Sequence, residues 1–342
     1  MKTRTLGKTG LVVSEVGFGG IPIIPLSEED AISTVRYCYA QKITFFDTAN
    51  MYGDSEKKIG AALRDVRNKV VYATKTLARD AMTAASHIDT SLLNLKTDVI
   101  DLYQLHNVSK QEDIDNIFAA GGALEAIQQA KSQGKISHIG FSSHDLKTAI
   151  QMCRTDLFST VQFPFNFIEK EPADELFKVA EKLDMGIIAM KPLGGGLLDR
   201  ADLCFKFLQL YPNVLPIPGV QSREELDQIL ELYRSPSPLT AKDKKEIDDI
   251  RSQLGKRFCH RCGYCMPCAQ GVNITEVMMF PSLNRRLARD IALLFAEKAM
   301  ATVDNCTECG ECVEKCAYSL PVPEMLRDYK VMFDELKSRP VA

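Results

Sequence analysis

The sequence lacks any apolar run long enough to cross a bilayer, since none of about 18 consecutive apolar residues occurs in its 342 residues. The sequence also lacks a large excess of charge of one sign, because 45 Asp and Glu nearly balance 42 Lys and Arg. The net charge of -3 gives no electrostatic footprint for nucleic acid or a membrane surface. An apolar signal core is missing from Met1 to Gly7. We therefore expect a cytoplasmic protein with neither nucleic acid nor a membrane as partner.

The first two thirds of the chain alternate strand-like apolar runs with helix-like stretches. The strand candidates are residues 15–18, 43–47, 70–75, 99–106, 136–141, 159–163, 186–190 and 214–217. The helical patterns occupy residues 28–41, 55–65, 80–95, 122–133, 145–154, 172–184, 201–210 and 222–233, with Ser27 and Asp145 suited to N-caps. Eight alternating pairs, preceded by a hairpin over residues 3–13, predict an α/β protein with a (β/α)8 TIM barrel.

A doubly wound open sheet is the alternative architecture. Such sheets commonly carry a Gly-rich phosphate-binding turn after the first strand. Here Gly17-Phe18-Gly19-Gly20 leads instead into prolines at 22 and 25, so the barrel is favoured. Residues 22–26 and 107–121 are expected to be loops at the barrel mouth.

The last third of the chain differs in composition. Eight of the eleven cysteines lie between residues 259 and 316, whereas Cys38, Cys153 and Cys204 are scattered through helical patterns. The segment Ser235–Thr240 is typical of a linker, and helical patterns follow at 240–254, 274–300 and 323–336. We predict two domains, a barrel over residues 1–238 and a small, mostly α-helical domain over residues 239–342.

Four polar side chains lie at or just after predicted strand ends: Asp47, Tyr52, Lys75 and His106. Taken singly, each has an ordinary structural interpretation, such as a satisfied core histidine or a solvated lysine. In a parallel barrel, however, the carboxyl ends of the strands converge on the face where catalysis occurs. A lysine buried there needs a carboxylate, for which Asp47 is the candidate.

Together these groups can interconvert a carbonyl and an alcohol by hydride transfer. A lysine beside Tyr52 is expected to lower the pKa of the phenol, because a nearby cation favours phenolate. Tyr52 then acts as general acid or base near neutral pH. His106 orients and polarises the carbonyl oxygen of a small-molecule substrate.

At these residues the chain resembles the aldo-keto reductases. The matching motifs are Arg4-x-Leu6-Gly7-x-Thr9-Gly10-Leu11, Phe46-Asp47-Thr48-Ala49-x-x-Tyr52-Gly53, Ala73-Thr74-Lys75, Asp101-Leu102-Tyr103-x-Leu105-His106, Gly134-Lys135-Ile136-x-x-Ile139-Gly140-Phe141-Ser142 and Ile217-Pro218-Gly219. They cover roughly residues 1–235 in the family's order. The resemblance implies that Asp47, Tyr52, Lys75 and His106 are the catalytic four, with Tyr52 as proton donor.

The resemblance also implies that NADP or NAD binds at the barrel mouth without a Rossmann fold. It places Ser142, Ser143 and Gln162 at the nicotinamide carboxamide. It places the remaining cofactor contacts at Met190, Lys191, Pro192, Leu193, Gly194, Pro218, Gly219, Gln221, Ser222, Arg223 and Glu225. Met190 replaces the tyrosine that stacks on the nicotinamide in many relatives. Gly219 and Glu225 stand where cations commonly bind the 2′-phosphate, which leaves Arg223 and makes the choice between NADP and NAD open.

The clustered cysteines form two closely spaced runs. They are Cys259-x2-Cys262-x2-Cys265-x2-Cys268 and, after 37 intervening residues, Cys306-x2-Cys309-x2-Cys312-x3-Cys316. Disulfides are rare in the cytoplasm, and zinc sites usually use two separated pairs. Iron–sulfur clusters favour repeated Cys-x2-Cys, and the second run has the bacterial ferredoxin spacing.

Eight cysteines suffice for two [4Fe–4S] clusters. In two-cluster ferredoxins the last cysteine of each run crosses to the other cluster. That arrangement assigns Cys259, Cys262, Cys265 and Cys316 to one cluster, and Cys268, Cys306, Cys309 and Cys312 to the other. The first run has x2 instead of x3 before its last cysteine, and Ala269 and Ala317 stand where proline is usual. The long helical insert resembles the helical ferredoxin modules of respiratory enzymes, and the whole chain resembles the aldo-keto reductases with a C-terminal ferredoxin-type domain.

Three functions fit these features. The first is a carbonyl reductase whose clusters are structural or sense redox state. The second is an electron-transfer oxidoreductase, in which the clusters pass single electrons between a ferredoxin-like partner and the barrel. The third is a non-catalytic barrel used as a binding or redox-sensing scaffold, against which the intact set of four polar residues argues.

Overall fold

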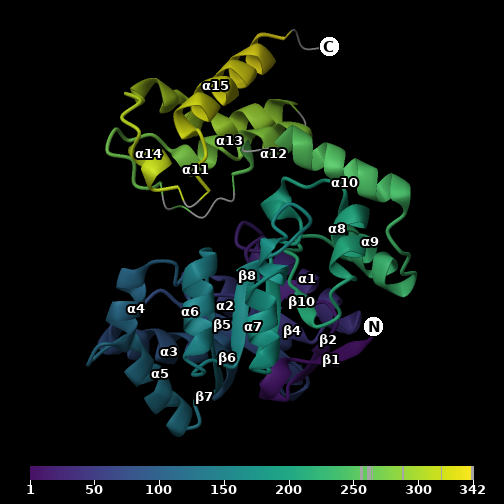
Figure 1. Ribbon diagram of the computed structural model, residues 1–342. Helices are drawn as coiled ribbons and strands as arrows, with labels where there is room; N and C mark the ends of the chain where they lie inside the picture. The colour runs from purple at the N-terminus through teal and green to yellow at the C-terminus, as the bar shows by residue number, and fades with distance from the viewer. Residues whose placement is uncertain (255–256, 260–262, 264, 287–288, 317, 340–342) are drawn as a thin grey trace. The chain divides into compact units, whose positions relative to one another are not determined.

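The computed structural model describes residues 1–254, 257–259, 263, 265–286, 289–316 and 318–339. Its internal contacts divide the chain into two compact units, whose elements are labelled in Figure 1. The first unit comprises Met1–Leu193 and Arg200–Thr240, and the second comprises Gly194–Asp199 and Ala241–Ala342. The short segment 194–199 therefore packs with the C-terminal unit, although its sequence lies among the barrel elements.

The first unit is built on eight parallel strands, each hydrogen-bonded to the next in sequence. They are β3 (Phe18–Gly19), β4 (Phe45–Asp47), β5 (Val71–Thr76), β6 (Ile100–Leu105), β7 (Ile136–Ser142), β8 (Thr160–Pro164), β9 (Gly186–Met190) and β10 (Val214–Pro216). The first and last strands also meet, because Gly19 pairs with Gly219 and the Gly17 amide donates to the Pro216 carbonyl at 2.9 Å. The predicted TIM barrel is confirmed, and the open sheet was the wrong alternative.

Helices surround these strands in Figure 1. They are α1 (Glu28–Ala40), α2 (Ser55–Leu63), α3 (Ala81–Leu95), α4 (Gln111–Phe118), α5 (Ala123–Ser132), α6 (Leu146–Arg154), α7 (Leu176–Lys182), α8 (Ala201–Leu208) and α9 (Arg223–Arg234). Both predicted N-caps are confirmed, since Ser27 accepts from the Asp30 amide at 3.1 Å and Asp145 from the Thr148 amide at 2.8 Å.

Helix α4 is a correction, because residues 107–121 were expected to be a loop. Helix α4 is only eight residues long, and it buries Ile114 and Ile117. Eight residues are fewer than the window of about 11 to 18 over which a helical period is recognised in a sequence. The helix matters for the site, because it begins just after the loop that follows His106.

The N-terminal hairpin closes the amino end of the barrel. Strands β1 (Thr3–Thr5) and β2 (Val12–Ser14) pair antiparallel, as predicted. Leu6 and Val13 are buried in one cluster with apolar side chains of the barrel strands. Gly7 has φ +51° and lies so close to the start of β9 that a Cβ would stand 2.4 Å from the Gly186 nitrogen. A site for small molecules therefore has only the carboxyl end of the strands available.

The second unit is helical. Its elements are α10 (Ala241–Leu254), α11 (Ile274–Val277), α12 (Phe280–Arg286), α13 (Arg289–Ala301), α14 (Glu311–Glu314) and α15 (Val322–Ser338), with a 3-10 turn, η6 (Val303–Asn305). Val277, Phe280, Met300 and Met325 are fully buried in its core, and cysteines pack against this core. The predicted helical C-terminal region is confirmed.

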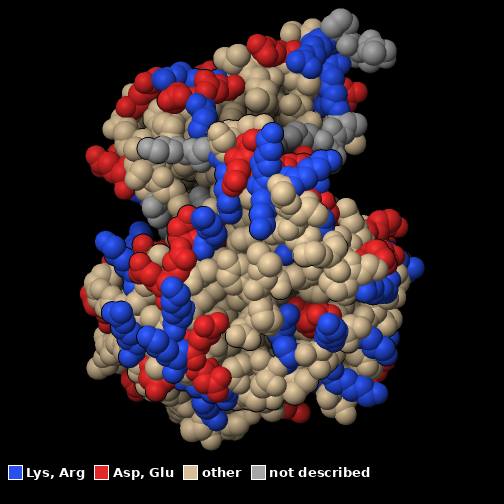
Figure 2. Space-filling view, turned by 45° about the vertical axis from the view of Figure 1, so that its right-hand side comes forward, with Lys and Arg blue, Asp and Glu red and all other residues tan. Residues whose placement is uncertain are grey.

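Two surface properties of the described residues bear on function. No helix among them is both long enough and apolar enough to pass through a membrane. On the face drawn in Figure 2, basic and acidic side chains are interspersed, in keeping with the nearly balanced charge of the sequence.

Candidate active site

Strand register brings the predicted polar residues to one end of the barrel. Lys75 on β5 is paired with Gln104 on β6, and Ser142 on β7 with Gln162 on β8. The His106 amide, one residue beyond β6, donates to the Thr76 carbonyl at 2.8 Å. Lys75, His106, Ser142 and Gln162 therefore lie at the carboxyl ends of adjacent parallel strands, as predicted, and Gln104 lies among them.

Lys75 and Asp47 form a buried ion pair. The Lys75 ammonium donates to Asp47 Oδ1 at 2.5 Å and to the Thr48 carbonyl at 2.7 Å, and Gln104 Nε2 donates to Asp47 Oδ2 at 3.3 Å. The side chains of Lys75 and Asp47 are 0% and 4% exposed. Because burial disfavours both charges, the pKa of Lys75 is lowered and that of Asp47 is raised. Each ion in such a setting depends on the other, as the sequence predicted.

Tyr52 and His106 lie beside this pair. Their rings meet edge to face, with centroids 5.6 Å apart and an interplanar angle of 81°. The Lys75 ammonium lies 5.5 Å from the centroid of the Tyr52 ring. The structure thus brings all four predicted catalytic residues together.

The predicted effect on Tyr52 has the wrong sign. The pKa of Tyr52 is raised, first because burial disfavours phenolate and second because Asp47 contributes negative charge. The positive charge of Lys75 is already engaged by Asp47 and the Thr48 carbonyl. Tyr52 is therefore a protonated phenol at neutral pH, which suits it to donate a proton.

His106 is held neutral. Burial, followed by the positive charges of Lys75 and Arg79, lowers the pKa of His106 to about 3. Its Nδ1 atom is buried without a hydrogen-bond partner among the described residues. A neutral imidazole here can donate one hydrogen bond to a carbonyl oxygen without contributing charge.

The residues expected at the nicotinamide carboxamide lie next to these groups. Ser142 and Ser143 are buried, and Ser143 Oγ accepts from the Asp145 amide at 3.1 Å. Gln162 is hydrogen-bonded to Asp47, yet its buried Oε1 has no partner in the described part of the chain. Because an unpaired buried acceptor is costly, this oxygen fits an amide donor such as the carboxamide. The residues present therefore fit a nicotinamide.

The segment after β9 contains the next group of expected cofactor contacts. Lys191 has φ +55°, so the chain turns sharply as it leaves the strand. The side chains of Met190 and Lys191 are partly buried. Pro192 is buried and Leu193 partly buried. Gly194 is packed in the second unit, where a Cβ on it would lie 2.7 Å from Phe258 Cζ. Gly194 thus follows Leu193 directly in the chain but is counted with the second unit.

The expected adenosine contacts precede α9. Pro218 and Gly219 pair with the backbone of Gly19. Ser222 caps α9 by accepting from the Glu225 amide at 3.2 Å, and Glu225 accepts from the Gln221 amide at 2.9 Å. Arg223 donates to Ser33 Oγ at 2.9 Å and lies 5.1 Å from the Tyr37 ring centroid. The Glu225 carboxylate therefore bonds the backbone at the start of its own helix, α9. Arg223 is the cation of this segment that could meet a 2′-phosphate.

The cysteines of the second unit line two cavities. One is lined by Cys259, Cys265 and Cys316, together with apolar side chains that include Leu320 and Val322. The other is lined by Cys265, Cys268, Cys306, Cys309 and Cys312. Cys262 lies outside the described residues. No three His, Cys, Asp or Glu side chains in the described ranges converge as they would around a single metal ion. The described thiols of the two runs instead line these two cavities.

Comparison with known proteins bears on both units. Residues 15–203 match the model of the aldo/keto reductase family, and residues 258–321 match that of a 4Fe-4S dicluster domain. The chain belongs to the aldo/keto reductase family. It is 30% identical over 217 residues to L-galactose dehydrogenase of Arabidopsis thaliana, covering 58% of this chain and 67% of that protein. It is 29% identical over 210 residues to a probable aldo-keto reductase of Glycine max, of which it spans 59%.

Solved aldo-keto reductases share the barrel fold. The holo form of an enzyme from Bacillus halodurans has a TM-score of 0.63 at 23% identity, covering 73% of this chain and 96% of that one. An aldo-keto reductase from Klebsiella pneumoniae in complex with NADPH has a TM-score of 0.62 at 20% identity, with the same two coverages. The fold and the family are thus established for the barrel, and the C-terminal 4Fe-4S dicluster domain is an addition to it.

Sequence reasoning missed two residues of this aldo/keto reductase site. Gln104 supplies the amide that bonds Asp47 Oδ2, and Arg79 contributes to the low pKa of His106. Gln104 did leave a signal, because it is a polar residue within an apolar strand and two positions before His106 on the same face. Arg79 left none, since nothing in its surroundings in the sequence points to a partner 27 residues away.

Proposed function

We propose that the barrel interconverts a carbonyl and an alcohol by hydride transfer, with NADPH or NADH as the hydride donor. The observation that carries the proposal is the convergence of Tyr52, the Lys75–Asp47 pair and neutral His106 beside the unpartnered Gln162 Oε1. Bound nicotinamide would supply the hydride in reduction and accept it in oxidation. The reaction belongs to residues 1–238, and the clusters belong to residues 239–342.

The nucleotide would be held along the mouth of the barrel. Ser142, Ser143 and Gln162 would bind the carboxamide, and Met190 would pack on the nicotinamide ring. The contacts proposed for the pyrophosphate and adenosine are Lys191, Pro192, Leu193, Gly194, Pro218, Gly219, Gln221, Ser222, Arg223 and Glu225. The amides at the start of the 12-residue helix α9 favour an anionic group near Ser222.

Tyr52 would act as the acid in carbonyl reduction. As hydride reaches the carbonyl carbon, negative charge develops on the oxygen, and the Tyr52 hydroxyl donates its proton there. The phenolate that remains faces the Lys75 ammonium, and Asp47 keeps that ammonium charged in its buried position. In alcohol oxidation the same atoms carry the proton in the opposite direction.

His106 would orient the substrate. Its low pKa keeps the imidazole neutral, so it donates a hydrogen bond to the carbonyl oxygen without competing with Tyr52 as an acid. The edge contact between the two rings lets both reach the same oxygen.

The C-terminal unit would carry two [4Fe–4S] clusters, which supply one-electron chemistry when bound. We assign Cys259, Cys262, Cys265 and Cys316 to one, and Cys268, Cys306, Cys309 and Cys312 to the other. The separate cavities support this crossed pairing, because Cys316 lines the cavity of the first run and Cys268 that of the second. Cys265 lines both cavities, as a ligand at the wall between two neighbouring clusters would.

One observation favours a second function, in which the clusters exchange single electrons with a ferredoxin-like partner. Cys309 is exposed, whereas the other described cysteines of the two runs are partly buried. A cluster held by Cys309 would therefore have an edge at the surface, where a partner protein can approach it. This function and carbonyl reduction can coexist in one chain.

The test of carbonyl reduction is Tyr52→Phe in the anaerobically purified, cluster-loaded protein. Nucleotide oxidation at 340 nm with a panel of aldehydes and ketones should fall about 100- to 10,000-fold when the proton donor is removed. The matched control is Tyr72→Phe, because Tyr72 is also buried, has its pKa raised to about 12 by that burial, and has the Arg67 guanidinium 4.4 Å from its ring centroid. Equal activity in both variants would refute Tyr52 as the acid, and a wild-type protein inert towards every carbonyl would point to the scaffold function.

A further inference from the structure

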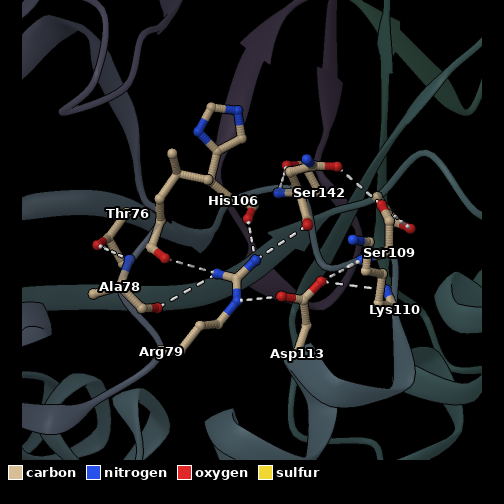
Figure 3. A network of polar contacts seen from close by, with 11 residues as sticks. Thr76, Ala78, Arg79, His106, Ser109, Lys110, Asp113 and Ser142 are labelled. Atoms are coloured by element: carbon tan, nitrogen blue, oxygen red, sulfur yellow. Dashed lines mark hydrogen bonds and ion pairs between the residues drawn. The ribbon is translucent and has the colours of Figure 1, made fainter. Parts of the chain in front are cut away.

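Arg79 occupies the loop between β5 and α3, and each of its five N–H donors is used. Nε donates to Asp113 Oδ1 at 2.9 Å. Nη1 reaches the Leu77 and Ala78 carbonyls at 3.2 and 3.4 Å, and Nη2 reaches the His106 and Asn107 carbonyls at 2.9 and 3.1 Å. The planar guanidinium is suited to such a fork, which no lysine can reproduce. Arg79 therefore ties the loop after β5 to the loop after β6 (Figure 3).

Asp113 extends the tie to the far end of the second loop. Its Oδ2 accepts from the amides of Ser109 and Lys110, both at 3.2 Å, at the start of helix α4. The segment His106–Lys110, which we call the His106 turn, is thus held at its first two carbonyls by Arg79 and at its last two amides by Asp113. The pair is about one-fifth exposed, so water weakens these bonds only in part.

The His106 turn determines where the imidazole lies. Asn107 has φ +54°, a left-handed conformation that asparagine adopts more readily than most other non-glycine residues. In Figure 3 the His106 carbonyl faces the guanidinium, and the imidazole lies on the opposite side of its backbone. Because Nδ1 has no partner among the described residues, the ring depends on its backbone and on its contact with Tyr52 for placement.

The same turn is bonded to the residues proposed to bind the carboxamide. The Asn107 amide donates to Ser142 Oγ at 2.9 Å, and the Val108 amide donates to the Ser142 carbonyl at 2.8 Å. The His144 amide donates to Ser109 Oγ at 2.9 Å. One network thus connects the group that orients the substrate oxygen with the groups that orient the hydride donor.

We propose that Arg79 is a positioning residue for hydride transfer, which acts by holding the His106 turn so that His106 and Ser142 keep a fixed separation. Arg79 touches neither reactant, and no bond to it forms or breaks in the reaction. The inference rests on the proposed carbonyl reduction. Its physical basis is that a shift of about 1 Å in a reacting group can cost about a hundredfold in rate.

A purely structural role is the competing explanation, and the chain contains a matched control for it. Arg67 is likewise about one-fifth exposed and paired with an aspartate, Asp101, at 2.8 Å. It also donates to two backbone carbonyls, those of Val70 and Val99, at 2.9 and 2.6 Å. Arg67 connects the amino ends of β5 and β6, whereas Arg79 connects their carboxyl ends. The two arginines differ in location relative to the site and little in chemistry.

The experiment compares Arg79→Gln with Arg67→Gln in the full-length, cluster-loaded protein. Both changes should lower thermal stability, but only Arg79→Gln should lower kcat, by about 10- to 100-fold. With nucleotide deuterated at the transferred position, Arg79→Gln should also increase the isotope effect on kcat, because hydride transfer becomes slower relative to product release. Arg79→Lys should recover little, since it restores the charge and not the fork.

A second readout does not depend on activity. In protein labelled with 15N-histidine, the ring resonances of His106 should shift in Arg79→Gln and stay in place in Arg67→Gln. Equal kinetic losses in the two variants, or unchanged His106 resonances in Arg79→Gln, would overturn the inference. If the wild-type protein reduces no carbonyl, the proposed function fails. The ring resonances of His106 then decide by themselves whether Arg79 positions His106. If Arg79→Gln does not fold, Asp113→Asn replaces it with the same expected results.

Discussion

At the scale of single residues, the site depends on which protonation states burial selects. Burial makes Tyr52 a weaker acid and His106 a weaker base than the free side chains. One therefore stays protonated and the other neutral through the physiological pH range. The Lys75 ammonium places positive charge close to where the phenolate of Tyr52 would form. Because Lys75 and Asp47 are a buried ion pair, they titrate together and not as separate groups.

These pKa shifts predict the pH dependence of carbonyl reduction. The rate depends on protonated Tyr52, whose pKa lies above the ordinary value of about 10, so activity is lost only as pH rises through that higher value. His106 has a pKa of about 3 and loses no proton in the neutral range. We expect kcat/KM to be flat between about pH 6 and pH 9, where a free histidine would titrate near 6.5. A change in kcat/KM centred near pH 6.5 would contradict a neutral His106 imidazole. The control variant is His87→Asn, which removes a histidine outside the site.

At the scale of elements, the barrel positions the site through its strand ends and is closed at the other end by the hairpin. The hairpin depends on one close approach, that of Gly7 to the backbone of Asp184, Met185 and Gly186 at the start of β9. Leu6, next to it, is buried against the inner apolar cluster of the barrel. Both the turn and the packing are needed for the hairpin to fit.

Replacing Gly7 tests this fit against a control in the same hairpin. Gly7→Ala and Gly10→Ala both place a side chain at positive φ, which costs about 1 kcal/mol. A Cβ at Gly10 meets nothing within 4 Å, whereas one at Gly7 would lie 2.4 Å from the Gly186 nitrogen. Gly7→Ala should therefore lower the free energy of unfolding by about 1–3 kcal/mol more than Gly10→Ala. Equal denaturation midpoints would show that the hairpin yields without cost.

At the scale of the whole molecule, the proposed function combines hydride chemistry in one unit with one-electron chemistry in the other. A nicotinamide exchanges two electrons at once and a cluster exchanges one, so direct exchange between them is unfavourable without an intermediary. Whether the two units are connected electronically is therefore a question about the complete, loaded protein.

The cluster ligands are tested by replacing Cys309. The wild-type protein should hold about eight irons per chain, as two [4Fe–4S] clusters require, and Cys309→Ala should hold about half. The control is Cys153→Ala, because burial raises the pKa of the Cys153 thiol to about 12 and the residue lies in the barrel helix α6. Full iron content in Cys309→Ala would refute its assignment as a ligand. Retained carbonyl reduction in a stable Cys309→Ala protein would argue against an electron relay to the barrel.

Anaerobic titration with NADPH and then NADH tests the connection between the units. If hydride chemistry and clusters are separate, neither nucleotide should bleach the visible absorbance of the clusters, although nucleotide binds. Bleaching would instead favour the electron-transfer function and would call for an intermediary that splits the electron pair. Binding is followed by nucleotide fluorescence, which keeps an absence of bleaching from being mistaken for an absence of binding.

The sequence by itself determined the eight strands, the barrel, the helical C-terminal region and the identity of the candidate residues. Apolar periodicity, turn residues and motif spacing are local properties, so they can be recognised without coordinates. Helix α4 was not recognised because its eight residues are too few to establish a helical period.

Only the tertiary structure decided how the candidate residues behave. The pKa of Tyr52 is raised and not lowered, because the balance between burial, Asp47 and an already engaged Lys75 is a property of the packed site. The packing of Gly194 against Phe258 in the second unit is likewise a property of the folded chain. So is the hydrogen bond from Arg79 to the His106 carbonyl. Desolvation and long-range hydrogen bonds depend on which surfaces meet, and the order of residues alone does not specify that.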